Sequence, residues 1–319
     1  MSTWPPSAED RTPDPDTVIE HVGWNIQHGQ RLADALALLE DRAEHTGRGP
    51  DLLTLQELGP GQGQEVAGRL ALTYVASPPN ERPGSETALF YNPALFRADP
   101  AWTQYPSGIR HNPAVALLRM LHPDTGQASF RPLFVASCHA SYSDPALREH
   151  QARFLSELDK DGWLALVQGD WNSWPVWGCP TNLDEVADRA FAQNRSLLQP
   201  DGTFRPDDHA DRLLTYGGMT DVGRHTATVL GRDGADRATT GHGADKTRQR
   251  VPDHHLPPGG AGPIDRTYAT TELLPALHDA TILAGKEVQR ISDHLPQVTR
   301  WLLPGLWDVM NRPIVPIRH

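Results

Sequence analysis

The chain has 319 residues, of which 38% are hydrophobic and 22% are charged, and its formal net charge is −11. These proportions are typical of a soluble globular protein with a substantial core, in one large domain or two of ordinary size. The acidic balance argues against a protein that holds long nucleic acid through a general basic excess, unless a local basic patch or bound cations compensate.

Residues 1–17 are polar and rich in proline, and we expect them to form a disordered arm rather than a signal peptide. The two cysteines, Cys138 and Cys179, are too few for a disulfide framework. No apolar run approaches the roughly 18 residues that a membrane span requires. The sequence therefore predicts a cytoplasmic protein without a membrane partner.

Short β-like runs recur along the chain, with helical patterns between some of them. The predicted strands are residues 17–26, 51–58, 86–92, 114–121, 132–140, 163–170, 265–270 and 297–303. Helices are predicted over residues 31–47 and 145–162, where leucines recur at helical spacing and a glycine ends each pattern. Because strands and helices do not alternate strictly, the pattern indicates α/β layers around a mixed sheet or a pair of sheets.

Two segments near the C-terminal end stand apart from these elements. Residues 231–263 are rich in glycine, proline and histidine, which predicts a long loop or insertion. Lys246, Arg248 and Arg250 make this segment mildly basic, and it is either a solvated flap or a lid that contacts substrate, with Arg248 as a candidate substrate-binding residue. Residues 304–319 form a C-terminal tail that we expect to pack on the domain.

Hard oxygen and imidazole groups stand inside or at the ends of β-like runs. They are Asn25, Gln56, Glu57, His139, Asp170, Asn172, Asp265, Ser292, Asp293 and His294. Any one of them could be an ordinary turn or cap residue, since Asp and Asn are favoured where a strand gives way to a turn. Rigid strands are nevertheless the elements best suited to fixing ligands. Residues two apart on a strand share a face, so Asp170 and Asn172 are expected to point to the same side.

The segments GWNIQ, LQEL, GDWN and SDHLP resemble, in order and spacing, the motifs of the endonuclease/exonuclease/phosphatase superfamily, whose fold is that of deoxyribonuclease I. The resemblance spans roughly residues 20 to 300. It implies a single catalytic domain, residues 18–303, built as an α/β four-layer sandwich of two packed mixed sheets flanked by helices. The segment SCHA in place of the usual Asn-x-His, the long insertion and a tryptophan-rich tail depart from the pattern.

The resemblance also implies metal-dependent hydrolysis of a phosphoester. Glu57 and Asp293, with Asn25 beside them, would hold Mg²⁺ or Mn²⁺, because oxygen ligands suit these ions better than zinc. His139 would act on the phosphate as a donor or general acid, and Glu86 would fix its tautomer.

The remaining motif residues would act on the attacking water and the phosphate. By the same resemblance, Asp170 orients or deprotonates the water, and Asn172 hydrogen-bonds the phosphate. His294 contacts a non-bridging oxygen or serves as base, and Asp265 holds it in place. A non-catalytic binding module with this fold would be expected to lack such residues, and this chain retains them.

The substrate stays open between two classes. A nuclease is slightly favoured by Glu86 with His139 and by the basic run in the insertion. A phosphatase or phosphodiesterase acting on a small nucleotide, sugar phosphate or lipid headgroup is favoured by the acidic charge. The tryptophans at positions 171, 174 and 177 either pack in the core or stack on a base, and Trp174 is kept as a candidate substrate-binding residue.

Overall fold

The computed structural model describes residues 17–78, 85–104, 112–179, 183, 193–240 and 262–314. The predicted N-terminal arm lies almost wholly outside these residues, and so do Lys246, Arg248 and Arg250 of the insertion. None of the helices in the described part of the chain combines the length and the apolar character that crossing a membrane requires.

The first of two mixed sheets has the strand order β13-β14-β1-β2-β4-β3. Its strands are β1 (Val18–Asn25), β2 (Leu52–Leu58), β3 (Thr73–Ala76), β4 (Glu86–Tyr91), β13 (Leu277–Ile282) and β14 (Gln297–Leu302). β1 and β2 run parallel, whereas the other neighbours are antiparallel.

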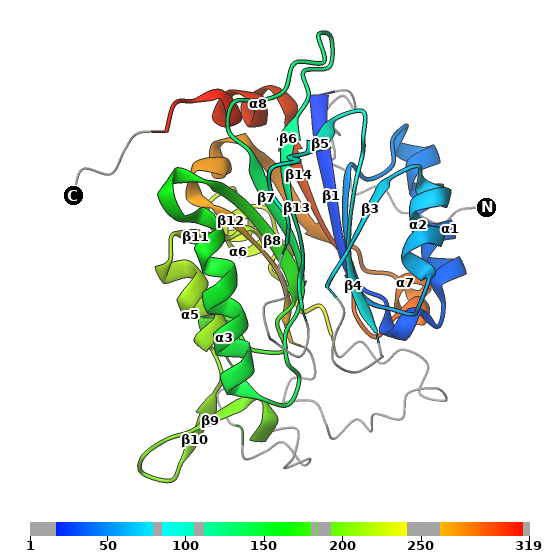
Figure 1. Ribbon diagram of the computed structural model, residues 1–319. Coiled ribbons are helices and arrows are strands. Elements are labelled where there is room, and N and C mark those ends of the chain that lie inside the picture. The colour runs from blue at the N-terminus through cyan, green and yellow to red at the C-terminus, as the bar shows by residue number, and fades with distance from the viewer. Residues whose placement is uncertain are drawn as a thin grey trace.

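The second sheet has the order β11-β12-β8-β7-β6-β5. Its strands are β5 (Phe96–Ala98), β6 (Ala114–Met120), β7 (Leu133–His139), β8 (Leu164–Asp170), β11 (Met219–Asp221) and β12 (Asp265–Thr270). Here β7 and β8 form the parallel pair. A separate hairpin of β9 (Ser196–Leu198) and β10 (Phe204–Pro206) extends from the lower end of the molecule in Figure 1.

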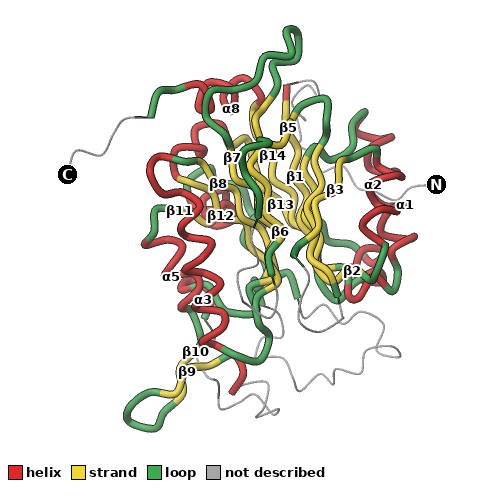
Figure 2. Tube along the Cα trace, viewed as in Figure 1, coloured by secondary structure: helices red, strands yellow, loops and turns green. Residues whose placement is uncertain are grey.

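Helices cover the outer faces of both sheets, as Figures 1 and 2 show. The helices are α1 (Leu32–Thr46), α2 (Gln62–Leu70), α3 (Pro145–Ser156), α5 (His209–Tyr216), α6 (Val222–Thr228), α7 (Lys286–Ile291) and α8 (Leu303–Asn311). Short 3-10 turns occupy Gln27–Gly29, Glu157–Gly162, Val176–Gly178 and Thr271–Ala276. Apolar residues of α1, α2 and α7 pack on the first sheet, and those of α3 and α5 pack on the second. The predicted four-layer α/β sandwich is therefore confirmed.

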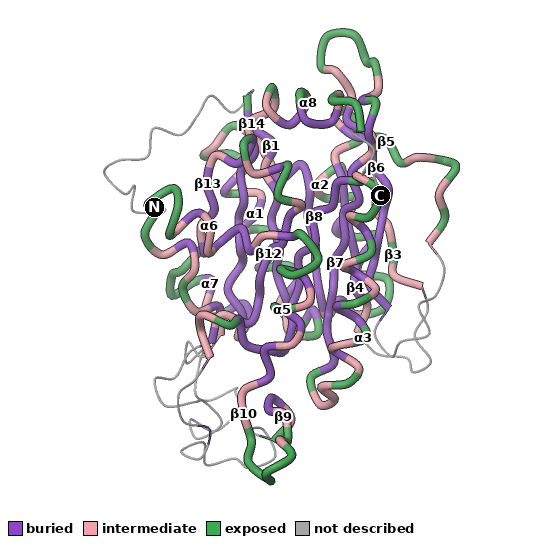
Figure 3. The backbone as a smooth tube through the Cα atoms, turned by 90° about the vertical axis from the view of Figure 1, so that its left-hand side faces the viewer, coloured by how far each residue is buried: buried purple, intermediate pink, exposed green. Residues whose placement is uncertain are grey.

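The inner faces of the two sheets change character along their length. In β1, Ile19 faces the apolar core between the sheets, whereas His21 and Asn25 occupy later positions on the same face. At the polar end, hydrogen bonds cross from sheet to sheet: Thr54 donates to Gln168 at 2.6 Å, and Gln56 donates to Ser137 at 2.9 Å. The strands are buried over most of their length (Figure 3), so these polar groups depend on one another for hydrogen bonds, and Gln56 Oε1 and Gln168 Nε2 are left without a partner among the described residues.

α8 identifies the apolar end of the sandwich. The first residue of β1, Val18, pairs with Leu302 directly before α8, and so β1 runs away from that helix toward Asn25. α8 and the β9–β10 hairpin accordingly lie at opposite ends in Figure 1. Leu306, Val309 and Met310 of α8 join the core between the sheets, and the packed domain thus continues past residue 303.

Candidate active site

Three of the predicted site residues lie side by side on neighbouring strands of the second sheet. Asp170 ends β8, and it pairs in register with His139 at the end of β7 and with Asp265 at the start of β12. From the first sheet, Asn25 reaches across to donate its amide Nδ2 to Asp170 Oδ2 and to Glu57 Oε1, each at 3.1 Å. Both sheets therefore contribute to one cluster, at the polar end of the sandwich.

Glu57 reaches this cluster because β2 is irregular there. Gln56 faces the inner side, so regular alternation would send Glu57 to the outer face. Its backbone instead has a φ of 62°, and the register with β4 shifts between Leu55 and Leu58. The backbone N–H of His28 donates to Glu57 Oε2 at 3.1 Å. The carboxylate is thus held at the cluster with 15% of its side chain exposed.

His294 lies in the loop after α7 and is fixed from two sides. The indole of Trp24 donates to its backbone carbonyl at 2.9 Å, while Ser292 Oγ donates to the carbonyl of Asn25 at 2.7 Å. The ring Nδ1 of His294 lies 2.8 Å from Asp265 Oδ2. The ring is therefore oriented with Nε2 toward the centre of the site, 3.8 Å from Asp170 Oδ2.

The charges of these groups depend on one another. Burial lowers the pKa of His294, but the carboxylates of Asp265 and Asp170 outweigh it and hold that pKa well above the usual range. Burial raises the pKa of Asp170, yet His294 and His139 outweigh it and keep that pKa below its usual value. The pKa of Asp265 is raised, mainly by burial. Asp170 is consequently an ionised carboxylate in a buried site.

His139 completes the ring of groups around Asp170. Its Nε2 lies 3.7 Å from Asp170 Oδ2 and 3.6 Å from Glu57 Oε1. Asp293 lies on the other side of the site, with Oδ1 4.0 Å from His294 Nε2 and about a third of its side chain exposed. The four carboxylates and two histidines that the motifs predict are therefore joined by contacts of 4.0 Å or less.

Asn172 lies beside Asp170 for a different reason from the one expected. Strand alternation is the wrong explanation, because β8 ends at Asp170 and Asn172 has a left-handed φ of 48°. The turn is held by the backbone N–H of Asn172, which donates to Asp170 Oδ1 at 2.9 Å. Such a carboxylate-to-backbone bond two residues on is common for Asp at turns.

The amide of Asn172 has a partner that the sequence analysis missed. Arg195 donates from a terminal guanidinium nitrogen to Asn172 Oδ1 at 2.7 Å, and Asn172 Nδ2 donates to the carbonyl of Ala140 at 3.1 Å. Burial lowers the pKa of Arg195 to about 10, which still leaves it charged at neutral pH. Arg195 lies 23 residues beyond Asn172 and outside every motif, so nothing local in the sequence marks it.

Comparison with solved structures identifies the fold. D. rerio TDP2 complexed with a single-strand DNA product superposes with a TM-score of 0.56 at 16% identity, over 89% of this chain and 98% of that one. The endonuclease/exonuclease/phosphatase from Bacteroides vulgatus gives the same TM-score, identity and coverage. An AP endonuclease from Archaeoglobus fulgidus gives a TM-score of 0.55 at 14% identity, over 88% and 98% of the two chains.

This chain has the fold of the endonuclease/exonuclease/phosphatase superfamily. The resemblance that its four motifs predict is confirmed at the level of the fold. No protein-family model matches the chain, and no curated protein sequence matches it either. At these identities the superfamily fold is established by shape, while the chemistry must be argued from the residues of the site.

The donor atoms of the site suit a hard cation. Asp170, Asp265 and His294 offer ligand atoms that all lie within 4.8 Å of one another. Asp265 and His294, however, already hydrogen-bond each other. Glu57 and Asp293 are the more exposed carboxylates of the site. Asn25 donates from its amide nitrogen to Glu57 and Asp170, and its Oδ1 accepts from the backbone N–H of Gln27 at 3.1 Å. Asn25 therefore braces the two carboxylates, and its place as a metal ligand stays a prediction.

Two of the other candidates lie within the described residues. Glu86 begins β4 and accepts a hydrogen bond from the hydroxyl of Tyr74 at 3.1 Å, and its support of His139 stays a prediction. Trp174 is only 3% exposed, as the packing alternative expects. Cys138 is buried on the outer face of β7, on the side of the strand opposite His139.

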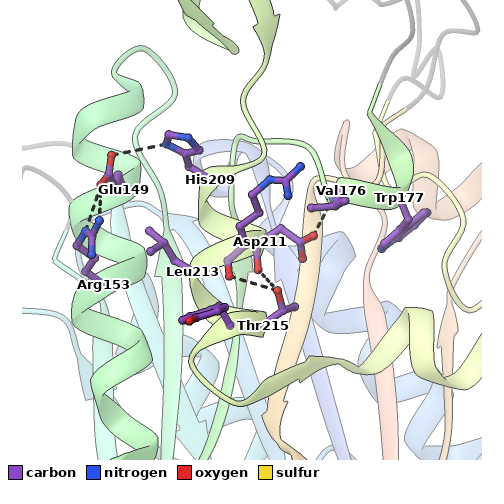
Figure 4. Close-up of a pocket in the computed structure, with 10 residues that line it drawn as sticks. Glu149, Arg153, Val176, Trp177, His209, Asp211, Leu213 and Thr215 are labelled. Atoms are coloured by element: carbon purple, nitrogen blue, oxygen red, sulfur yellow. Dashed lines mark hydrogen bonds and ion pairs between the residues drawn. The ribbon is translucent and has the colours of Figure 1, made fainter.

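A groove on the outer helical layer is separate from this site. Figure 4 shows it between α3 and α5, with Glu149 of α3 facing both Arg153 and His209. Val176 and Trp177 form its other side. None of the residues that line this groove belongs to the cluster around Asp170, and it is not the candidate active site.

Proposed function

We propose that the protein is a divalent-metal-dependent phosphoester hydrolase that cleaves phosphodiester bonds of nucleic acid. The observation that carries this proposal is the set of contacts around Asp170. One buried, ionised carboxylate has an imidazole on either side and a second carboxylate behind one of those imidazoles. Hydrolysis of a phosphoester requires such groups, because a water must be aligned and deprotonated while negative charge on the phosphoryl oxygens is stabilised.

Each group has a task that its contacts support. Asp170 accepts the proton of the attacking water or orients that water, since its low pKa keeps it ionised. His294, held by Asp265, donates from Nε2 to a non-bridging oxygen. His139 donates to the phosphate from the opposite side, and Asn172, fixed by Arg195, keeps a second amide N–H for the phosphate.

Glu57 and Asp293 are the residues that we propose hold the metal, Mg²⁺ or Mn²⁺. When bound, such an ion polarises a phosphoryl oxygen and offsets the excess of carboxylates over imidazoles. The Glu57 carboxylate is already oriented by Asn25 and His28, so it needs little reorganisation to serve as a ligand.

The nature of the neighbours supports nucleic acid as the substrate. Among the similar structures, D. rerio TDP2 is complexed with a DNA product, and another is an AP endonuclease. The net charge of −11 favours the second candidate, a phosphatase or phosphodiesterase acting on a small phosphoester, because a large polyanion is repelled more strongly.

A hydrolysis assay separates these possibilities. Plasmid DNA, single-stranded DNA, RNA, mononucleotides and bis(p-nitrophenyl) phosphate would be incubated with Mg²⁺ or with EDTA. We expect cleavage of polymers in Mg²⁺, none in EDTA, and none with Asp170→Asn. Release of phosphate from mononucleotides alone would assign the second function, and activity that persists in EDTA would refute the metal requirement.

The metal ligand can be tested in the same assay. Glu57→Gln removes a ligand charge, and we expect the Mg²⁺ concentration for half-maximal activity to rise at least about tenfold. Glu44→Gln, on the exposed face of α1, is the matched control and should leave the Mg²⁺ concentration for half-maximal activity unchanged. An equal response from the two variants would remove Glu57 from the metal site.

A further inference from the structure

Tyr142 is an exposed aromatic ring close to the catalytic cluster. It follows the end of β7 by three residues, and 57% of it is exposed. The guanidinium of Arg195 lies 5.7 Å from the centre of its ring. Arg195 itself is only 7% exposed, and the ring therefore lies at the surface with a buried cation against it.

Direct contacts connect this ring to the proposed reaction centre. The guanidinium against Tyr142 donates to Asn172 Oδ1 at 2.7 Å, and the backbone of Asn172 donates to Asp170 Oδ1 at 2.9 Å. A group stacked on Tyr142 would therefore be connected to the carboxylate that acts on the water through Arg195 and Asn172.

The arrangement is built into the fold by a buried arginine. Arg148 of α3 is 1% exposed, and it donates to the backbone carbonyls of Ser141 and Asn194, each at 2.6 Å. These two residues directly precede the aromatic ring and the guanidinium. Its third contact is with the buried carboxylate of Asp207 at 2.7 Å. Arg148 thus holds together the two segments that present Tyr142 and Arg195.

We propose that Tyr142 is a stacking platform for the base of an unpaired nucleotide whose phosphate is bound at Asp170. This inference deepens the proposed function and rests on it. Aromatic side chains bind single-stranded nucleic acid in this way because every base has a π-face, whereas the bases of a duplex are stacked on each other. Arg195 acts as a positioning residue for both the ring and Asn172.

Other exposed aromatic rings do not have this connection. Phe130 is at the α8 end of the sandwich, where its backbone N–H donates to Asn311. Tyr216 ends α5 on the outer layer and lines the separate groove. The tryptophans at positions 171 and 174 are buried and present no free face. Three described aromatic residues have more than half of their area exposed, and of these Tyr142 is the one whose ring lies against Arg195, the residue that hydrogen-bonds Asn172.

The test compares two esters with the same leaving group. Thymidine 5′-(p-nitrophenyl phosphate) carries a base, and methyl p-nitrophenyl phosphate does not. In Mg²⁺ we expect Tyr142→Ala to raise KM for the thymidine ester about 5- to 100-fold with little change in kcat, and to leave the methyl ester unaffected. Tyr142→Trp should restore the wild-type KM, and Tyr216→Ala, the matched control, should change neither ester.

A binding measurement keeps this inference separate from the proposed function. Calorimetry with a dithymidine methylphosphonate, which resists hydrolysis, should show binding to the wild type that Tyr142→Ala loses. If Tyr142→Ala affects both esters equally or neither, the stacking platform is refuted. If the wild type hydrolyses neither ester, the proposed function fails. If the wild type and Tyr142→Ala then bind the methylphosphonate equally, the stacking platform is overturned as well.

Discussion

The side chain of Asp265 contributes to the site through a neighbour, since it orients the His294 ring by a contact of 2.8 Å. We expect Asp265→Asn to lower kcat by about 10²–10⁴, because the amide neither holds the ring in the same way nor stabilises its positive charge. The matched control is Asp279→Asn, which breaks a buried ion pair with Arg300 in the first sheet. Steady-state kinetics on any cleaved ester would measure both, and a loss of kcat in the control variant alone would contradict this role.

Arg195 and Asn172 should behave as one unit. Arg195→Lys replaces a planar fork by a single ammonium, and we expect kcat to fall roughly tenfold as the amide of Asn172 loses its orientation. Once Asn172 is absent, the arginine should matter little for kcat. The double variant with Asn172→Ala is therefore expected to lose no more than Asn172→Ala alone, and losses that multiply would show that the two residues act independently.

At the scale of elements, the parallel pair β7 and β8 depends on a close approach at Gly169. A Cβ at this position would lie 2.0 Å from the backbone oxygen of Cys138, so the two strands would have to separate. We expect Gly169→Ala to cost about 1–3 kcal/mol in the free energy of unfolding and to displace Asp170 from His139.

The control for this change is another glycine with space around it. At Gly68, inside α2, an added Cβ would have no atom within 4 Å, and Gly68→Ala should stabilise the protein by about 0.4–1 kcal/mol. Urea unfolding would measure both variants, with kcat recorded in parallel. Equal stability of the two alanine variants would contradict the packing argument.

The stability of the whole molecule should depend on pH through His21. Burial lowers the pKa of His21 to about 3, from 6.5. Below pH 6.5 the unfolded chain takes up a proton at His21 that the folded chain excludes. The contribution of neutral His21 to the free energy of unfolding is therefore fully present above pH 6.5 and is lost as pH falls toward 3. By pH 4.5 the loss amounts to about 2–3 kcal/mol.

Replacing this histidine should flatten that dependence. His21→Gln keeps a polar group for Thr54 and cannot titrate, so unfolding free energies measured between pH 7 and pH 4 should fall less steeply. His45→Gln, on the exposed end of α1, should follow the wild type. Parallel curves for wild type and His21→Gln would show that another group governs the acid limb.

Much of this molecule can be predicted from local patterns. Apolar runs in segments such as PLFVASCHA and WLALVQGD predict β7 and β8, since a strand buried on both faces is apolar along its length. Short elements were missed, among them β3, β11 and α6, because three to seven residues carry too little periodicity. Glu57 was expected at the site by motif, but the bulge that turns it there has no signature in LQEL.

The sequence by itself determined the order of the motifs, the type of the long elements and the kinds of groups available for chemistry, because these depend on residues near one another in the chain. Only the tertiary structure decided which of those groups meet. Asn25 and Asp170 are 145 residues apart and belong to different sheets, and Arg195 reaches Asn172 from outside any motif. Such contacts are set by how two sheets pack and by loop paths between strands, and no local period encodes either.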